Sequence, residues 1–201
     1  MLIIDADPTR MIDLPGVGPC PRPVDIDQSV TGFKRLKSLR IYSFQPEVTI
    51  EGESEGDEVF VLPLGGTVAM EIAGEHPLSA HLSDMGDCAL YMMPDHAYTL
   101  RPQSHVRVAY ARAAASGRIP SYTSDAQEGN TAEALAYQLA DLANGAMLSL
   151  PANRERLVHL RHGALMAGDR LVRAPQTLAL AKGESVSLCA KGAARVLVLS
   201  A

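Results

Sequence analysis

The sequence has few of the residues on which nucleic-acid and membrane recognition depend. It contains no tryptophan, and its aromatic residues make up only 4% of 201 positions. So few aromatic side chains leave little surface on which nucleobases could stack. Its 18 Lys and Arg residues are outnumbered by 23 Asp and Glu residues, for a formal net charge of -5. We therefore expect neither nucleic acid nor an anionic membrane surface as a partner.

Cysteine and long apolar runs are also scarce. Cys20, Cys88 and Cys189 are too far apart for a CxxC metal clip, and their odd number does not suggest a disulfide framework. No apolar stretch approaches the roughly 18 residues that cross a bilayer, and no basic leader precedes residues 1–4. These absences favour a cytoplasmic protein with a core of aliphatic side chains, for which 47% hydrophobic residues are ample.

The pattern that is present is one of short strands. Residues 39–115 and 146–201 contain brief apolar runs of period two, separated by Gly, Pro and Asp. Residues 1–38 include the run PGVGPCPRP, which excludes a helix or a central strand, so we expect an extended N-terminal arm. The arm is expected to add a strand to a barrel or to a partner subunit.

Residues 116–145 are interpreted as a linker with one helix. Asn130 and Glu133 have the spacing of a helix N-cap and its N3 residue. Leu135, Leu139 and Leu142 follow on one face of the predicted helix, and a Gly after them gives a stop signal.

The two strand-rich regions align with each other at an offset of 88 residues. Residues 89–93 then match 177–181, and residues 107–110 match 195–198. With a shorter hairpin in the second copy, Glu58 also matches Glu155. Identities are few, so chance is the competing explanation. A duplicated unit of this size predicts two small antiparallel barrels, closed to remove their sheet edges.

The first copy resembles a cupin domain. Its residues follow the frame of the two cupin motifs: Glu51-x-Glu53-x4-Glu58 with a later Gly65-Gly66, then Gly86-Asp87 and the run from Pro94 to Thr99. The resemblance implies an all-β double-stranded β-helix, the cupin jelly roll. Together with the repeat and the predicted helix, it gives a tandem bicupin with one linker helix. The chemistry departs from the family pattern, because Glu replaces both first-motif histidines and the last ligand position falls on Thr99.

Among bicupins, residues 39–115 are most similar to the family of 5-deoxyglucuronate isomerase and 5-keto-4-deoxyuronate isomerase. The likeness lies in the Glu-rich run 51–58, the sequence VLPLGG at 61–66 and YMMP at 91–94. It implies a divalent metal, held by His and Glu, that assists proton transfer between sugar carbons. No two of the six histidines are separated by a single residue, so no strand presents a pair of imidazoles to one barrel interior. A standard cupin metal centre is therefore not expected.

Three carboxylates form the first candidate site. Glu51 and Glu53 share one face of a strand, and a turn would bring Glu58 beside them. Carboxylates gathered inside a barrel repel one another unless a cation neutralises them, and an oxygen-liganded Mn²⁺, Mg²⁺ or Ca²⁺ would do so. The alternative is that residues 51–58 form a solvated acidic loop with no cofactor bound.

Further along the chain, Thr99 and Arg101 share a strand face. A hydroxyl and a guanidinium on one barrel wall would hold the carboxylate of a sugar acid. Alternatively, Arg101 ends a hairpin in solvent. His96 is either an acid-base group at the barrel mouth or an exposed loop residue.

In the second copy, Glu155, His159 and Arg161 share a face of one strand. They form a second polar pocket if they point inward. They form an exposed charged edge if they point outward.

Three functions remain open at this stage. The first is a cupin-like protein that binds a sugar or sugar acid with a degenerate metal site, through Glu51, Glu53, Glu58, Thr99 and Arg101. The second is a metal-dependent sugar-acid isomerase with an oxygen-only site. The third is a structural cupin without a ligand. We expect a small polar metabolite as partner and a homodimer as the assembly.

Overall fold

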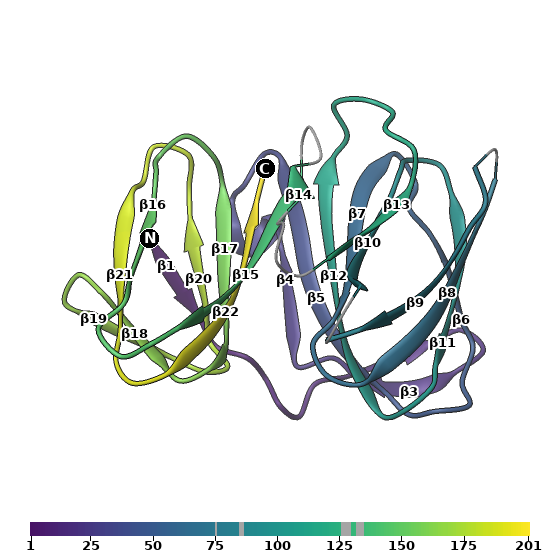
Figure 1. The fold of residues 1–201 in the computed structure, drawn as a ribbon, viewed down its shortest axis with the longest axis horizontal. Helices are drawn as coiled ribbons and strands as arrows, with labels where there is room; N and C mark the ends of the chain where they lie inside the picture. Colours follow the sequence, from purple (N-terminus) through teal and green to yellow (C-terminus); the bar gives the residue numbers. More distant parts are fainter. Residues whose placement is uncertain (75, 85–86, 126–129, 132–134) are drawn as a thin grey trace.

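The computed structural model describes residues 1–74, 76–84, 87–125, 130–131 and 135–201. Figure 1 shows two β-barrels side by side, with the C-terminus at the junction between them. The one helix of the described residues is the single turn α1 (Gln28–Thr31), which Asp27 caps by accepting a hydrogen bond from Ser29 N. No described helix has the length and apolar character needed to span a bilayer.

The first barrel consists of a six-stranded and a four-stranded antiparallel sheet. The large sheet has the order β13-β10-β7-β12-β5-β4, and the small sheet has the order β6-β11-β8-β9. The large-sheet strands are β4 (Val24–Asp27), β5 (Leu36–Phe44), β7 (Asp57–Pro63), β10 (Asp87–Met92), β12 (Val106–Ala114) and β13 (Tyr122–Asp125), and the small-sheet strands are β6 (Ile50–Glu53), β8 (Thr67–Ala73), β9 (Leu78–Ser83) and β11 (Ala97–Pro102).

The second barrel repeats this arrangement strand for strand. Its large sheet has the order β1-β20-β17-β22-β15-β14, and its small sheet has the order β16-β21-β18-β19. The correspondence confirms the duplication predicted from the 88-residue offset. The strands are β1 (Leu2–Ile4), β14 (Asn130–Thr131), β15 (Ala136–Leu142), β16 (Met147–Leu150), β17 (Arg156–His162), β18 (Ala164–Ala167), β19 (Arg170–Arg173), β20 (Thr177–Leu180), β21 (Val186–Ala190) and β22 (Ala194–Ser200).

The predicted linker helix is wrong, because its described residues 130–131 and 136–142 form strands of the second barrel. β15 pairs with β22 along its whole length, and β14 pairs with β15. Leu139 packs between the barrels and Leu142 packs against the interior of the second barrel, so β15 alternates between two faces. Its leucine spacing suits a helix face, but pairing with β22 decides the outcome. Glu133, the expected N3 residue, lies outside the described residues, as does Gly86 of the second cupin motif.

The N-terminal arm contacts both barrels. Its first strand, β1, pairs with β20 at the edge of the second barrel, so the arm adds a strand to a barrel as predicted. The run PGVGPCPRP lies in and after a hairpin formed by β2 (Met11–Leu14) and β3 (Gly18–Pro21). Ile12, Leu14 and Val17 from this hairpin pack against the interior core of the first barrel.

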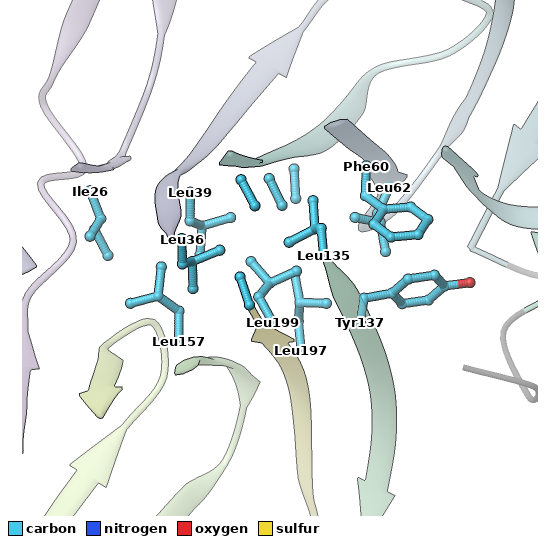
Figure 2. Packing of buried hydrophobic residues seen from close by; sticks show 14 of the residues in the cluster. Ile26, Leu36, Leu39, Phe60, Leu62, Leu135, Tyr137, Leu157, Leu197 and Leu199 are labelled. Carbon is cyan, nitrogen blue, oxygen red and sulfur yellow. The ribbon is translucent and has the colours of Figure 1, made fainter. Parts of the chain in front are cut away.

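Apolar side chains fill the interiors of both barrels and the space between them. Along β7, Val59 and Val61 point into the first barrel, whereas Phe60 and Leu62 point toward the second. Figure 2 shows Phe60 and Leu62 close to Leu135 and neighbouring side chains at the junction. A strand that is buried on both faces needs no polar alternation, which explains the continuous apolar run of β7.

Candidate functional site

The structure brings three of the predicted ligand residues together on the outside of the first barrel. Glu51 and Glu53 are exposed, and Thr99 lies directly across from Glu51 on β6 and from Glu71 on β8. These side chains line a surface hollow of about 720 Å³ on the outer face of the small sheet, together with residues such as Ser79. We call this feature the outer hollow.

Arg101 is bound to a carboxylate at the surface. Its Nη1 lies 2.9 Å from Glu71 Oε1, and both side chains are about half-exposed. A pair this exposed contributes between 0 and about 1 kcal/mol to stability. Arg101 is not among the residues that line the outer hollow.

Glu58 lies apart from the other two glutamates. It is fully buried, on the face of β7 that looks toward the second barrel. Its Oε2 accepts a hydrogen bond from Leu135 N at 3.0 Å, and its Oε1 accepts one from Ser116 N at 3.4 Å. The predicted site of Glu51, Glu53 and Glu58 is therefore not assembled. Among the described residues, no group of three or more His, Cys, Asp or Glu side chains is placed to hold a metal ion.

Glu51 and Glu53 face solvent because Gly52, between them, faces the interior of the first barrel. Gly52, between the two glutamates, is directly across from Tyr98, and a Cβ on Gly52 would lie 2.6 Å from the Tyr98 hydroxyl oxygen. A side chain at position 52 therefore has no room, because the Tyr98 ring occupies the space. Because successive side chains of a strand point to opposite faces, the residues on either side of Gly52 face solvent.

The interior of the first barrel offers phenols in place of imidazoles. The Tyr110 ring lies 5.3 Å from that of Tyr42 and 6.0 Å from that of Tyr98, between ring centroids. Burial raises the pKa of Tyr98 and of Tyr110 above the usual value for a phenol. Neutral phenols among aliphatic side chains do not match the His, carboxylate and water ligands that divalent metals prefer. Among the side chains that the structure describes, the donors in this barrel do not fit the metal that the cupin fold implies.

A buried serine, Ser54, connects the two cupin-like motifs. Ser54 Oγ donates a hydrogen bond to Met93 O at 2.8 Å and accepts one from His96 N at 2.9 Å. The His96 ring is buried, with Nδ1 2.9 Å from Pro94 O and its other edge against Gly74. His96 is thus not an exposed loop residue, because its ring is buried against Gly74, just after β8.

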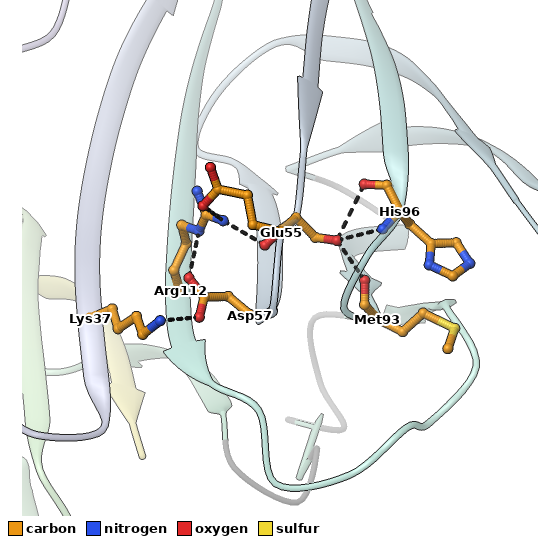
Figure 3. A network of polar contacts seen from close by, with 7 residues as sticks. Lys37, Glu55, Asp57, Met93, His96 and Arg112 are labelled. Carbon is orange, nitrogen blue, oxygen red and sulfur yellow. Dashed lines mark hydrogen bonds and ion pairs between the residues drawn. The ribbon is translucent and has the colours of Figure 1, made fainter.

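Asp57 anchors the same turn from the other side (Figure 3). Its carboxylate is buried and lies 2.5 Å from Lys37 Nζ and 3.2 Å from Arg112 Nε. Arg112 also donates to Ser54 O and is paired with Glu55. The acidic run 51–58 is therefore divided: its early carboxylates face solvent and its later ones hold the chain in place.

Glu155 is the counterpart of Glu58 in the second barrel. Its Oε1 accepts a hydrogen bond from Lys34 N at 2.7 Å, and its Oε2 accepts hydrogen bonds from Arg35 N at 2.8 Å and Leu36 N at 2.9 Å. Leu36 begins β5, and Leu135, which binds Glu58, immediately precedes the equivalent strand β15. Each barrel thus supplies a buried glutamate that accepts backbone hydrogen bonds at the start of a strand in the other barrel. The two strands, β5 and β15, are equivalent in the repeat. We call Glu58 and Glu155 the reciprocal glutamates.

A cleft of about 700 Å³ opens beside Glu155, where the two barrels meet. We call it the junction cleft. Lys34 and Arg35 line it from the first barrel, and Arg154 and Lys182 line it from the second. Within the described part of the chain, none of these four side chains has an ion pair or a hydrogen bond. Sequence reasoning missed this cleft, because its cations come from three segments that are far apart in the chain.

His159 and Arg161 face the first barrel. His159 Nδ1 lies 3.0 Å from Thr177 Oγ1, and both side chains are buried. Burial lowers the pKa of His159 to about 4, with further contributions from the charges of Arg107 and Arg161. Arg161 Nη2 donates across the junction to Leu64 O at 3.1 Å. This face of β17 is therefore neither an inward pocket nor an exposed edge.

The comparisons with known proteins identify the fold. No protein-family model matches the sequence, and no curated protein matches it either. Bacterial pirin YhhW from Escherichia coli, solved in complex with nickel(II), covers 99% of this chain and 97% of its own, with a TM-score of 0.76 at 12% identity. An IolB-like protein from Salmonella typhimurium LT2 covers 100% and 92%, with a TM-score of 0.75 at 12% identity.

Quercetin 2,3-dioxygenase from Acinetobacter baumannii covers 100% of this chain and 85% of its own, with a TM-score of 0.72 at 14% identity. Such neighbours establish an all-β bicupin fold. They include a metal complex and an enzyme by name, but identities this low carry the fold alone. The resemblance of residues 39–115 to one isomerase family stays a prediction.

Proposed function

We propose that this bicupin binds a small anionic metabolite of the sugar-acid class in the junction cleft. The observation that supports the proposal is a cleft of about 700 Å³ with four cationic side chains and one acidic one, Glu155. The Glu155 carboxylate accepts three backbone hydrogen bonds and contributes one negative charge, so the cations remain in excess. The volume lies within the range of about 300–1,000 Å³ that small-molecule sites occupy.

The lining suits a ligand that carries both an anionic group and hydroxyl groups. Guanidinium groups form paired, charge-assisted hydrogen bonds with carboxylates, and ammonium groups add point charges. The Ser116 hydroxyl and the Asn153 side chain line the same cleft and offer hydrogen-bond partners to hydroxyl groups. A uronic or aldonic acid has this combination.

A neutral sugar in the outer hollow is the second candidate. Glu51, Glu71 and Thr99 lie side by side there on three paired strands, where carboxylates and a hydroxyl would accept hydrogen bonds from sugar hydroxyls. The net negative lining disfavours a sugar acid. A metal-dependent isomerase is not supported by the donors in the first barrel, so we derive no reaction from it.

The proposal is tested by titrating glucuronate and glucose into the protein in a calorimeter. We expect glucuronate to bind and the paired variant Arg35→Gln/Arg154→Gln to lose at least about tenfold in affinity, since charge-assisted hydrogen bonds contribute about 1.5–3 kcal/mol each. Arg170→Gln/Lys191→Gln, which removes two exposed cations elsewhere, is the matched control. Absence of glucuronate binding, or equal loss in the control, contradicts the proposal.

Binding of glucose instead would favour the second candidate. In that case Glu51→Gln is expected to weaken glucose binding, whereas the arginine variants leave it unchanged.

A further inference from the structure

The cations of the junction cleft form two pairs that belong to different barrels. Lys34 and Arg35 precede β5 of the first barrel. Arg154 and Lys182 lie in the loops before β17 and after β20 of the second. A ligand that contacts only one pair leaves the other without a counter-charge. We infer that the cleft takes a dianion, with one anionic group held by each barrel.

Charge counting supports two anionic groups. Lys34, Arg35, Arg154 and Lys182 bring four positive charges to the lining, and the Glu155 side chain and the terminal carboxylate of Ala201 bring two negative ones, a net of +2. A monoanion leaves half of this charge in place, whereas a dianion balances it. The inference rests on the proposed function and narrows the ligand class to a sugar diacid, such as an aldaric acid, or to a sugar acid with a phosphate at the far end.

Glu155 fixes the distance between the pairs. It follows Arg154 in the chain, and its carboxylate binds the backbone N–H groups of Lys34 and Arg35. One buried side chain of the second barrel therefore positions both cations of the first. A site that is held in place before the ligand arrives loses less conformational freedom on binding, so the spacing of the pairs selects the ligand. Glu155 acts as a positioning residue.

The experiment compares the affinities of glucarate, 6-phosphogluconate and glucuronate at one salt concentration. We expect glucarate or 6-phosphogluconate to bind at least about tenfold more tightly than glucuronate, because the second anionic group meets the second cation pair. Tighter binding of either dianion supports the inference. The one that binds more tightly shows whether the second anionic group is a carboxylate or a phosphate. If glucuronate binds and neither dianion binds more tightly, the inference fails and the proposed function stands. If none of the three binds, both fail.

Variants of each cation pair locate the two ends. Lys34→Gln/Arg35→Gln and Arg154→Gln/Lys182→Gln are each expected to abolish the preference for the dianion. These side chains are exposed or half-buried, so the variants should fold. If either variant still binds the dianion more tightly than the monoanion, the ligand does not place one anionic group at each cation pair, and the inference is overturned.

The positioning role of Glu155 has its own comparison. Glu155→Gln is expected to reduce the ratio of dianion to monoanion affinity. Asp57→Asn, which removes another buried structural carboxylate whose partners Lys37 and Arg112 do not line the cleft, is expected to leave the ratio unchanged. An equal change of the ratio in both variants assigns Glu155 a structural role only.

Discussion

His159 gives the protein a calculable sensitivity to acid. Its imidazole is buried at the barrel junction beside Thr177 and the guanidinium groups of Arg107 and Arg161, and its pKa falls from 6.5 to about 4. The folded state therefore holds the neutral ring, while the unfolded chain takes up a proton near pH 6.5. Stability from this group is fully present above pH 6.5 and is lost as the pH falls toward 4.

The size of the effect follows from the shift. A difference of about 2.5 pKa units corresponds to about 3 kcal/mol, since one unit is 1.36 kcal/mol. The loss reaches about 1.4 kcal/mol at pH 5.5, where the unfolded state is mostly protonated and the folded state is not. It approaches its full value near pH 4.

The assay is urea unfolding of the wild-type protein and of His159→Gln at several pH values from 7.5 to 4. Carboxylates and the other histidines titrate in both proteins, so the difference between the two unfolding free energies isolates His159. We expect this difference to change by about 3 kcal/mol over the range, because the wild type loses more stability than the variant as the pH falls. Parallel pH profiles for the two proteins would refute the reasoning.

Two further predictions concern buried contacts. Glu155→Gln should lower the unfolding free energy by about 3 kcal/mol, because three buried N–H groups lose a charged acceptor, and denaturant unfolding at pH 7 measures it. Gly52→Ala should cost about 1–3 kcal/mol through its clash with Tyr98, and Tyr98→Leu in the same chain should recover part of that loss in a double-mutant cycle. Additive costs would show that the two residues do not compete for space.

The barrels were predictable because their strands carry a local signal. Runs of period two and the 88-residue offset identify the sheets and their duplication without knowledge of any contact. The helix error at residues 136–142 shows the limit of that signal. The sequence AYQLADL places leucines at a helical spacing, and as a strand it also directs apolar side chains toward two different cores, so the choice depends on β22, which lies far along the chain.

The sites were less predictable, because periodicity defines two faces of a strand without saying which one is inside. The alternation of Glu51, Gly52 and Glu53 fits either orientation, and the bulk of Tyr98 on the neighbouring strand decides it. The junction cleft is harder still, because it exists only after two barrels dock. The internal repeat did contain one signal, since it aligned Glu58 with Glu155 before their shared role was visible.

The origin of the edge strands has a consequence for the order of assembly. The first barrel completes its large sheet with β13, from the segment that follows it, whereas the second takes β1 from the opposite end of the sequence. On a ribosome, β1 is therefore synthesised well before its partner β20 and can pair with it only after the intervening residues 5–176 have emerged. Closing so long a loop is slow relative to local pairing. The first barrel can mature early, and capture of the N-terminal strand is a late event in folding.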